Sequence, residues 1–449
     1  MDFNYLLDQF FATLSLSLCL NTDQSKLMDK ILLRKSTNPF NVKIALASSK
    51  SESNRALIIN ALTDFSTGGV RCDLQNLSTA RDTQTMIRLL QSTDQVADVI
   101  DAGTTMRFLT AYFTATNQNK IMTGTPRMCE RPIGMLVDAL RTLGAEIDYV
   151  NKEGYPPLHI RGFSEQISNE VTIRGDVSSQ YISALLMVAP TLPQGLTITL
   201  TGELGSIPYI KMTLEQMRAF GVIHEANWEE KIIKVLPNSY QSTSYKIESD
   251  WSGASYWYSI VALSEFEETQ VELLGLKENS LQGDSDIVNI MAHLGVKSTF
   301  TDVGVLLTKI PAEKTLSWDF TNCPDLAQTV AVTCAAKGID ATFTGIESLK
   351  IKETDRIVAL QNELQKFGGE LLEVEKNTTY VVKNNPFIIQ RNVAPHSPFT
   401  IKTYDDHRMA MAFAPLAMLM DVIIEEPNVV VKSYPSFWSD IQKVVSFES

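Results

Sequence analysis

The sequence predicts an α/β fold of six repeated units, each with two helices and several short strands. A turn of small and polar residues leads into a helical run six times, and a second amphipathic helix recurs between these runs. We marked one residue in each turn, which gives Ser51, Gly103, Ser178, Ser252, Asp325 and Asp406. The markers are 52, 75, 74, 73 and 81 residues apart. Spacing this regular is typical of repeat architectures.

The turns before the first helices have the composition of helix N-termini that bind anions. Ser, Thr, Gly or Asp at such a turn leaves main-chain N–H groups free to bind an oxyanion. The turns or the helices that they open also carry cations, which are Lys50, Arg55, Arg107 and Arg408. If the units pack around common axes, these helix starts meet in one cleft. The pattern therefore predicts a site for a small, multiply anionic ligand.

The second helices show a 3.6-residue period of apolar side chains. The periodic sets are 86/89/90, 133/136/137/140, 210/214/217, 287/290/291/294 and 357/360/364. Most end at a glycine that suits the C′ position of a helix, namely Gly144, Gly221, Gly295 and Gly368. Short β-branched runs, including 171–173, 196–200 and 422–424, predict strands.

Length and charge restrict the class of protein. A chain of 449 residues with 44% hydrophobic residues predicts two or three domains with sizeable cores. The net charge of -13 argues against a nucleic-acid partner or an anionic membrane surface. The five cysteines include no CxxC pair, so neither a disulfide framework nor a zinc site is indicated. We therefore expect a reducing compartment and a cytoplasmic protein.

Residues 1–27 are interpreted as an N-terminal extension that does not belong to the native chain, with Met28 as the natural start. The apolar run 10–20 is too short to span a bilayer. The segment before it carries Asp2 and Asp8 and no Lys or Arg, which is the wrong charge for a secretory signal. No membrane segment is expected elsewhere.

The segment 348–356 is the densest cluster of charge in the chain. Five ionisable residues, Lys350, Lys352, Glu353, Asp355 and Arg356, fall within seven positions before a predicted helix. Asp355 and Glu353 suit a helix N-terminus, whereas the three cations do not. The cluster taken alone is either a solvated charged turn or a site for a phosphorylated or carboxylated ligand.

Five segments resemble the signature motifs of the 5-enolpyruvylshikimate-3-phosphate synthase family. They are Lys50-Ser51-Glu52-Ser53-Asn54-Arg55-Ala56-Leu57, Pro126-Arg127-Met128-Cys129-Glu130-Arg131-Pro132-Ile133-Gly134, Val177-Ser178-Ser179-Gln180, Lys352-Glu353-Thr354-Asp355-Arg356 and Tyr404-Asp405-Asp406-His407-Arg408-Met409-Ala410-Met411. The resemblance runs from about residue 42 to about residue 440, in the family's order.

The resemblance implies a two-domain inverted α/β barrel of the enolpyruvyl transferase type, with three units in each domain. One domain would comprise residues 28–47 and 250–449, and the other residues 48–249. The active site would lie in the interdomain cleft. The implied reaction transfers the enolpyruvyl group of phosphoenolpyruvate to the 5-hydroxyl of shikimate 3-phosphate and releases phosphate, through a tetrahedral intermediate. No metal or organic cofactor is implied, and the family suggests a monomer.

Site residues are carried over from the resemblance position by position. The implied catalytic residues are Asp325 as the base, Glu353 as the acid, Lys352 and His407. The implied shikimate 3-phosphate contacts are Lys50, Ser51, Arg55, Ser178, Ser179, Ser206, Tyr209, Asp325, Ser348 and Lys352. The implied phosphoenolpyruvate contacts are Lys50, Gly103, Arg127, Gln180, Arg356, Arg408 and Lys432. Arginine suits this task because its planar fork matches carboxylate and phosphate groups.

Plainer roles remain open for several of these residues. Asp325 follows a proline and could be only a helix cap, and Ser178 and Ser179 could likewise be caps. His407 could be a structural hydrogen-bonding residue. The chain also departs from the family pattern, because Asp101 and Ser348 stand where the family usually has Asn. For Asp101 we expect a carboxylate that turns away from the anion site or pairs with Arg107.

Two other functions are kept as alternatives. One is the sister enzyme that transfers enolpyruvyl to UDP-N-acetylglucosamine, although Cys129 stands at a different offset from that enzyme's reactive cysteine. The other is a non-catalytic anion-binding paralogue, which Asp101 and Ser348 would suggest. Because Gly103 leaves room beside the phosphoenolpyruvate site, the resemblance also implies inhibition by glyphosate.

Overall fold

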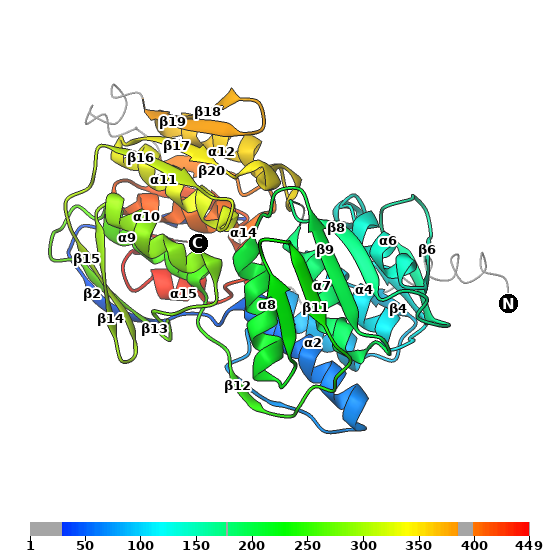
Figure 1. The fold of residues 1–449 in the computed structure, drawn as a ribbon. Coiled ribbons are helices and arrows are strands. Elements are labelled where there is room, and N and C mark those ends of the chain that lie inside the picture. The colour runs from blue at the N-terminus through cyan, green and yellow to red at the C-terminus, as the bar shows by residue number, and fades with distance from the viewer. Residues whose placement is uncertain (1–28, 177, 385–397, 449) are drawn as a thin grey trace.

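A computed structural model describes residues 29–176, 178–384 and 398–448. The predicted extension 1–27 and Val177 lie outside the described residues. The described residues form six small open sheets, five with four strands and one with two. The chain folds into two lobes (Figure 1). The sheets and helices stand in the order in which the six predicted units follow one another.

Three sheets belong to residues 48–249. Their strand orders are β4(Val96–Asp98)-β5(Lys120–Thr123)-β7(Leu158–Phe163)-β6(Ala145–Tyr149), β10(His224–Asn227)-β11(Ile232–Val235)-β9(Leu196–Thr201)-β8(Glu170–Arg174), and β12(Ser244–Lys246)-β3(Asp73–Gln75).

The other three sheets belong to the rest of the described chain. Their strand orders are β14(Val296–Thr301)-β15(Gly304–Lys309)-β13(Gln270–Leu274)-β2(Asn41–Ala45), β16(Thr315–Asp319)-β17(Asp340–Thr344)-β19(Thr379–Asn384)-β18(Gly369–Glu375), and β20(Phe399–Ile401)-β21(Val422–Glu425)-β1(Lys30–Leu33)-β22(Phe447–Glu448).

Each sheet contains one parallel pair of strands, and this pair explains the repeated unit. In four units the first helix is the crossover that joins the two parallel strands: β4-α4-β5, β8-α7-β9, β16-α11-β17 and β20-α14-β21. Parallel neighbours require such a crossover, whereas the antiparallel strands that follow are joined by short turns. The predicted alternation of helices and short strands is therefore confirmed.

The first helices begin within a few residues of the predicted markers. They are α2(Lys50–Thr67), α4(Gly103–Ala115), α7(Ser179–Val188), α9(Trp251–Leu263), α11(Ala327–Lys337) and α14(His407–Phe413). The remaining α-helices are α3(Arg81–Gln91), α5(Pro126–Cys129), α6(Gly134–Thr142), α8(Ile207–Ala219), α10(Ile287–His293), α12(Arg356–Leu364) and α15(Phe437–Ile441). Gly144, Gly221, Gly295 and Gly368 all have positive φ, as predicted for residues that end helices.

Short 3-10 helices extend or connect these elements. They are η1(Ala189–Thr191), η2(Gly283–Asp286), η3(Pro324–Leu326), η4(Glu347–Ile351), η5(Gln365–Phe367), η6(Ala414–Met418) and η7(Pro427–Lys432). The helix predicted up to Phe367 tightens into η5 for its last turn, as helix ends often do. Among the described residues, no helix is long and apolar enough to cross a membrane.

Buried apolar side chains form two separate clusters. One draws on residues 31–46 and 251–445, and the other on residues 57–240. Figure 1 shows β2, from the start of the chain, in the lobe otherwise built by the C-terminal half. The predicted domain boundaries near 48 and 249 stay a prediction, which this division of the core supports.

The two chain crossings between the lobes run side by side. Ser48 and Ser249 form an isolated antiparallel bridge, and Ser49 N–H donates to Glu248 O at 2.8 Å. The Glu248 side chain is buried and accepts hydrogen bonds from Trp251 Nε1 and Ser280 Oγ at 2.9 and 2.7 Å. This network fixes the crossings directly before the start of α9.

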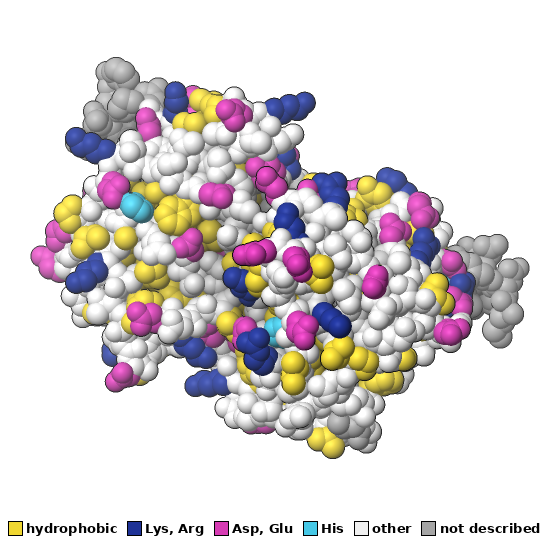
Figure 2. Space-filling model, viewed as in Figure 1, with side chains coloured by type: hydrophobic (Ala, Val, Ile, Leu, Met, Phe, Trp, Pro, Cys, Tyr) yellow, Lys and Arg dark blue, Asp and Glu magenta, His cyan; other side chains and the backbone are white. Residues whose placement is uncertain are grey.

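Basic and acidic side chains are interspersed over the face of the molecule drawn in Figure 2. On this face they do not gather into one large basic area.

Candidate active site

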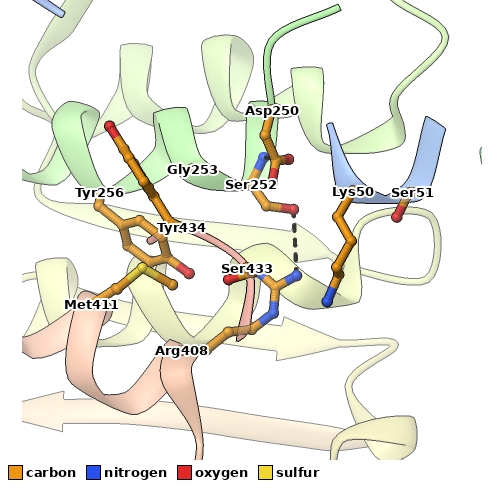
Figure 3. A pocket seen from close by; sticks show the side chains of 10 residues that line it. All are labelled: Lys50, Ser51, Asp250, Ser252, Gly253, Tyr256, Arg408, Met411, Ser433 and Tyr434. Atoms are coloured by element: carbon orange, nitrogen blue, oxygen red, sulfur yellow. Dashed lines mark hydrogen bonds between the residues drawn. The ribbon is translucent and has the colours of Figure 1, made fainter. Parts of the chain in front are cut away.

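Helix starts from both lobes meet around one small polar cavity (Figure 3). Lys50 and Ser51 come from the start of α2, Ser252 from α9 and Arg408 from α14. The complete lining is Lys50, Ser51, Asp250, Ser252, Gly253, Tyr256, Arg408, Met411, Ser433 and Tyr434. Three of the six predicted helix starts, those of α2, α9 and α14, thus meet at this cavity.

Asp325 lies at the centre of the cationic cluster beside this cavity. Its Oδ1 lies 3.0 Å from Arg356 NH1 and 3.5 Å from Lys352 Nζ, and its Oδ2 lies 2.9 Å from Arg408 NH2. Burial alone would raise the pKa of Asp325, but these cations outweigh it and hold the pKa well below its ordinary value. The side chain does not cap a helix, so the plainer reading of Asp325 as a cap is wrong.

Arg356 is the most heavily engaged cation of the cluster, and its side chain is 2% exposed. Its Nε donates to Asp406 Oδ2 at 2.6 Å and its NH2 donates to Glu353 Oε2 at 2.8 Å. Asp406 is fully buried and also accepts from Arg408 N at 2.8 Å as the cap of α14. Asp406 therefore fixes two arginines at once.

Glu353 is held between cations on two sides. Its Oε1 lies 3.4 Å from Lys432 Nζ, and its Oε2 contacts Arg356. Burial would raise the pKa of Glu353, yet Lys432, Arg356 and Arg131 together hold it well below its ordinary value. The carboxylate is therefore ionised at neutral pH, ready to accept or exchange a proton when the charges around it change.

Several contacts join the two lobes across the cleft. Arg127 donates to the main-chain oxygens of Lys352 and Glu353, both at 3.3 Å. Tyr209 OH donates to Asp284 Oδ1 at 3.3 Å, and Ser206 N donates to Thr321 O at 3.0 Å. Burial raises the pKa of Tyr209 well above its ordinary value, so its hydroxyl remains a donor. The cleft is closed in this structure.

Arg55 is buried within one lobe, where protein acceptors surround it. Its Nε donates to Thr213 Oγ1 at 2.7 Å, and its NH1 donates to Ser51 O at 2.9 Å. Burial lowers the pKa of Arg55 to about 10, which still leaves the guanidinium charged at neutral pH. Its predicted contact with shikimate 3-phosphate stays a prediction, and its observed role is to hold the start of α2.

The other predicted hydroxyl contacts differ in how they are placed. Ser178 is the N-cap residue of α7, but its side chain makes no capping hydrogen bond, and Ser179 behind it is buried. Gln180 Nε2 donates to Thr104 Oγ1 at 3.0 Å, which joins the starts of α7 and α4. Ser348 is exposed in η4, and among the described residues its side chain makes no hydrogen bond with the cluster.

Gly103 has no empty space beside its Cα. A Cβ there would lie 2.6 Å from Arg131 NH1 and 2.8 Å from Arg107 NH1. The room that the sequence analysis expected at Gly103 is therefore occupied by two guanidinium groups. Burial, with Arg107 adding to it, lowers the pKa of Arg131 to about 10.

His407 is buried, and within the described part of the chain neither of its ring nitrogens has a hydrogen-bond partner. Its Nδ1 lies 3.8 Å from Asp406 Oδ1. Burial lowers the pKa of His407 well below its ordinary value, and Lys50 and Arg408 act in the same direction. The imidazole is neutral. Because neither ring nitrogen is hydrogen-bonded among the described residues, a role as a structural hydrogen-bonding residue does not explain His407.

The expected pairing of Asp101 with Arg107 is wrong. Asp101 Oδ2 lies 2.8 Å from Arg81 NH2 and 2.9 Å from Lys432 Nζ, and Arg107 NH1 donates to Gly103 O instead. This bond directs the Arg107 side chain back along its own helix, to the residue four positions earlier. Asp101 therefore faces the cation site and does not turn away.

Sequence reasoning missed Asp284 and left Asp406 and Arg131 without a role. Asp284 accepts hydrogen bonds from Tyr209 OH and from Ser252 Oγ. Burial and then the neighbouring Asp325 raise the pKa of Asp284 to about 6. The available signal for Asp406 was its place before α14, where Asp is a preferred cap. Asp284 gave no comparable signal.

The charged residues of segment 348–356 have different roles. Lys352, Glu353 and Arg356 belong to the cluster described above. Asp355 caps α12 by accepting from Ile357 N and Val358 N, both at 3.1 Å, as predicted. Lys350 instead pairs with Glu373 at 3.2 Å on the surface. The reading of the whole segment as a solvated turn is wrong, although it fits Lys350.

Comparison with known sequences identifies relatives that match most of the chain. Residues 88–441 match the family described as EPSP synthase (3-phosphoshikimate 1-carboxyvinyltransferase). A 3-phosphoshikimate 1-carboxyvinyltransferase of Bacteroides fragilis (strain YCH46) is 48% identical over 403 residues, which cover 89% of this chain and 94% of that protein. A protein of the same name from Yersinia pseudotuberculosis serotype O:3 (strain YPIII) is 35% identical over 433 residues, which cover 90% of this chain and 96% of that protein.

Solved structures show the same fold. The structure of EPSP synthase from Acinetobacter baumannii superposes with a TM-score of 0.71 and covers 94% of this chain and 100% of the matched chain. Sequence identity to that chain is 17%, so this likeness concerns the fold. It confirms the predicted two-domain inverted α/β architecture, although no sheet of the described residues closes on itself.

Proposed function

This chain belongs to the EPSP synthase family, and we propose that it performs the family's reaction in the cationic cleft between its two lobes. As a 3-phosphoshikimate 1-carboxyvinyltransferase of the shikimate pathway, it transfers the enolpyruvyl group of phosphoenolpyruvate to the 5-hydroxyl of shikimate 3-phosphate and releases phosphate. The observation that carries the assignment of the site is the ion-pair cluster around Asp325, because a small anion can replace this partly buried carboxylate as the partner of the cations.

Phosphoenolpyruvate is proposed to bind between Lys50, Gly103, Arg127, Gln180, Arg356, Arg408 and Lys432. Arg356 and Arg408 currently pair with Asp325, at 3.0 and 2.9 Å. A substrate carboxylate or phosphate can take over these donors, and charge-assisted hydrogen bonds of this kind are short and strong. Loss of the two ion pairs would then return the pKa of Asp325 toward its ordinary range.

Shikimate 3-phosphate is proposed to bind next to this site, with Lys50, Ser51, Arg55, Ser178, Ser179, Ser206, Tyr209, Asp325, Ser348 and Lys352 as the candidate contacts. The start of α7 supports this proposal, because Ser178 is exposed, its side chain makes no capping hydrogen bond among the described residues, and a helix N-terminus can bind a phosphate through main-chain N–H groups. Ser206 occupies the corresponding position before α8, with a left-handed backbone.

The proton transfers are proposed to fall to the two partly buried carboxylates Asp325 and Glu353. Asp325 accepts the proton of the 5-hydroxyl as that oxygen adds to the enolpyruvyl carbon. Glu353 supplies a proton to the methylene carbon, after exchange with Lys352 or solvent, and later removes one as phosphate leaves. His407 is proposed to donate one hydrogen bond in this step, because its ring nitrogens are otherwise unpartnered among the described residues. Fixed groups of this kind typically contribute about 10²–10⁴-fold each.

The protein is further proposed to work as a cytoplasmic monomer with two domains, residues 28–47 plus 250–449 and residues 48–249. The paired crossings at Ser48 and Ser249 support these boundaries. Both crossings lie side by side there, so that the lobes can rotate about one hinge.

A phosphate-release assay with pairs of purified substrates tests the proposed function. Phosphate should appear only when phosphoenolpyruvate and shikimate 3-phosphate are both present, and UDP-N-acetylglucosamine should not replace the latter. Release with UDP-N-acetylglucosamine instead would favour the sister activity. Binding of both substrates without release would identify a non-catalytic anion-binding protein.

A further inference from the structure

An ion pair between Asp101 and Lys432 crosses the cleft. Asp101 follows β4 in one lobe, and Lys432 ends η7 in the other, 331 residues further along the chain. Lys432 Nζ donates to Asp101 Oδ2 at 2.9 Å and to the main-chain Asp101 O at 3.2 Å. Because the two residues belong to different lobes, this contact joins the lobes across the cleft.

The ammonium group of Lys432 also lies close to a second carboxylate, that of Glu353. Its Nζ lies 3.4 Å from Glu353 Oε1, and its side chain is 2% exposed. An ammonium group has three N–H donors, of which two are bonded to Asp101 while Glu353 lies within ion-pair distance. A ligand that binds Lys432 must therefore displace or share one of these protein acceptors.

We propose that Asp101 is a specificity-determining residue that weakens the cleft's affinity for phosphate and phosphonate groups by holding Lys432 across the cleft. The inference rests on the proposed assignment of Lys432 to the phosphoenolpyruvate site. A carboxylate at position 101 neutralises a binding cation and adds repulsion toward a dianion, whereas Asn would offer Lys432 a neutral acceptor of the same shape.

Arg81 limits this effect without removing it. Its NH2 lies 2.8 Å from the same Oδ2 of Asp101, and its side chain is 42% exposed, so solvent screens much of its charge. The carboxylate therefore retains negative charge toward the buried Lys432. Exchange of Asp101 for a neutral side chain should release Lys432 to the ligand while Arg81 turns to solvent.

The test is the KM for phosphoenolpyruvate in Asp101→Asn, measured by phosphate release at saturating shikimate 3-phosphate. We expect this KM to fall on the order of tenfold, because one repulsive charge leaves the site. The inhibition constant of inorganic phosphate, measured as a competitor, should fall in parallel. Asp101→Ser should act in the same direction, since it also removes the charge.

Asp98→Asn is the matched control. Asp98 is exposed on the same turn, and its Oδ1 accepts from Ile100 N at 2.7 Å, which an Asn oxygen preserves. This variant makes the same charge change outside the cleft and should leave the KM for phosphoenolpyruvate unchanged. Calorimetric binding of shikimate 3-phosphate should be equal in all variants, which shows that they are folded.

An unchanged or raised KM for phosphoenolpyruvate in both Asp101 variants, with shikimate 3-phosphate binding intact, overturns the inference. An equal decrease in Asp98→Asn also overturns it, because the effect would then be one of net charge. Wild-type protein without phosphate release would instead contradict the proposed function, so the two failures are distinguishable.

Discussion

Arg356 NH1 and Asp325 Oδ1 lie 3.0 Å apart, which pairs a proposed substrate-binding cation with the proposed catalytic base. Arg356 is buried and Asp325 partly so, and Asp325 is shared with Lys352 and Arg408. A carboxylate held in this way is a poor base until the cations acquire another partner. Substrate binding and activation of the base are therefore coupled through the same ion pairs.

Asp325→Asn tests the role of this carboxylate. The amide cannot accept a proton, so kcat should fall by about 10²–10⁴-fold, while phosphoenolpyruvate and shikimate 3-phosphate bind within a few-fold of wild type. Stopped assays of phosphate release and equilibrium titrations provide the two values. Asp340→Asn, at an exposed position of the same lobe, is the control. A loss confined to binding would contradict the assignment.

Arg356→Lys tests the need for a planar fork. Lysine cannot reach Asp406, Asp325 and Glu353 together, so buried carboxylates lose their partner. Removing one partner of a buried pair typically costs about 3–5 kcal/mol, so both the free energy of unfolding and the affinity for phosphoenolpyruvate should fall. Urea titration and substrate kinetics measure these quantities.

Arg174→Lys is the control for that variant, because the Arg174–Asp176 pair is exposed. Exposed pairs contribute roughly 0–1 kcal/mol, so this exchange should leave stability nearly unchanged. Equal losses in the two variants would show that the buried fork has no special role.

Gly103→Ala tests the packing against Arg131 and Arg107. The new methyl group would lie 2.6 and 2.8 Å from their NH1 atoms, so both guanidinium groups must shift. We expect a raised KM for phosphoenolpyruvate and relief of inhibition by glyphosate, measured as the inhibition constant. Gly205→Ala is the control, since its nearest neighbours lie 4.0 Å from the added atom. Glyphosate inhibition that Gly103→Ala leaves unaltered would reject this explanation.

His407→Gln tests the pH dependence that burial of a neutral imidazole predicts. The folded-state pKa lies well below the ordinary 6.5, so below pH 6.5 the unfolded chain binds more protons. Stability from this residue is therefore complete above about pH 6.5 and is lost as the pH falls through it. Urea midpoints at pH 7.5 and 5.5 should differ less in the variant than in wild type. An equal difference would show that His407 does not titrate as described.

Local signals explain why much of the fold was predictable from sequence. Helix caps, apolar periodicity and glycines such as Gly144 and Gly295 act within a few residues, and these predictions hold in the structure. The cations of the cleft were predictable because they stand in motifs that resemble a known family. The helix predicted to end before Gly368 differs from the structure only in its last turn, which is the 3-10 helix η5.

Partners far apart in the chain were not predictable. Arg356 pairs with Asp406 over 50 residues and Lys432 with Asp101 over 331, and no local pattern indicates either pair. For the same reason Asp101 was assigned to Arg107, a neighbour in sequence. Asp284 likewise contacts Tyr209 of the other lobe, 75 residues earlier in the chain.

Deuterium incorporation during a single turnover in D2O tests the central claim most directly, because addition–elimination requires a proton on the methylene carbon of phosphoenolpyruvate. Wild-type protein should form an enolpyruvyl product whose methylene carries deuterium. Glu353→Gln should bind both substrates but give neither product nor deuterium exchange into phosphoenolpyruvate. Product formed by wild type without deuterium, or exchange at the wild-type rate in Glu353→Gln, would contradict the account.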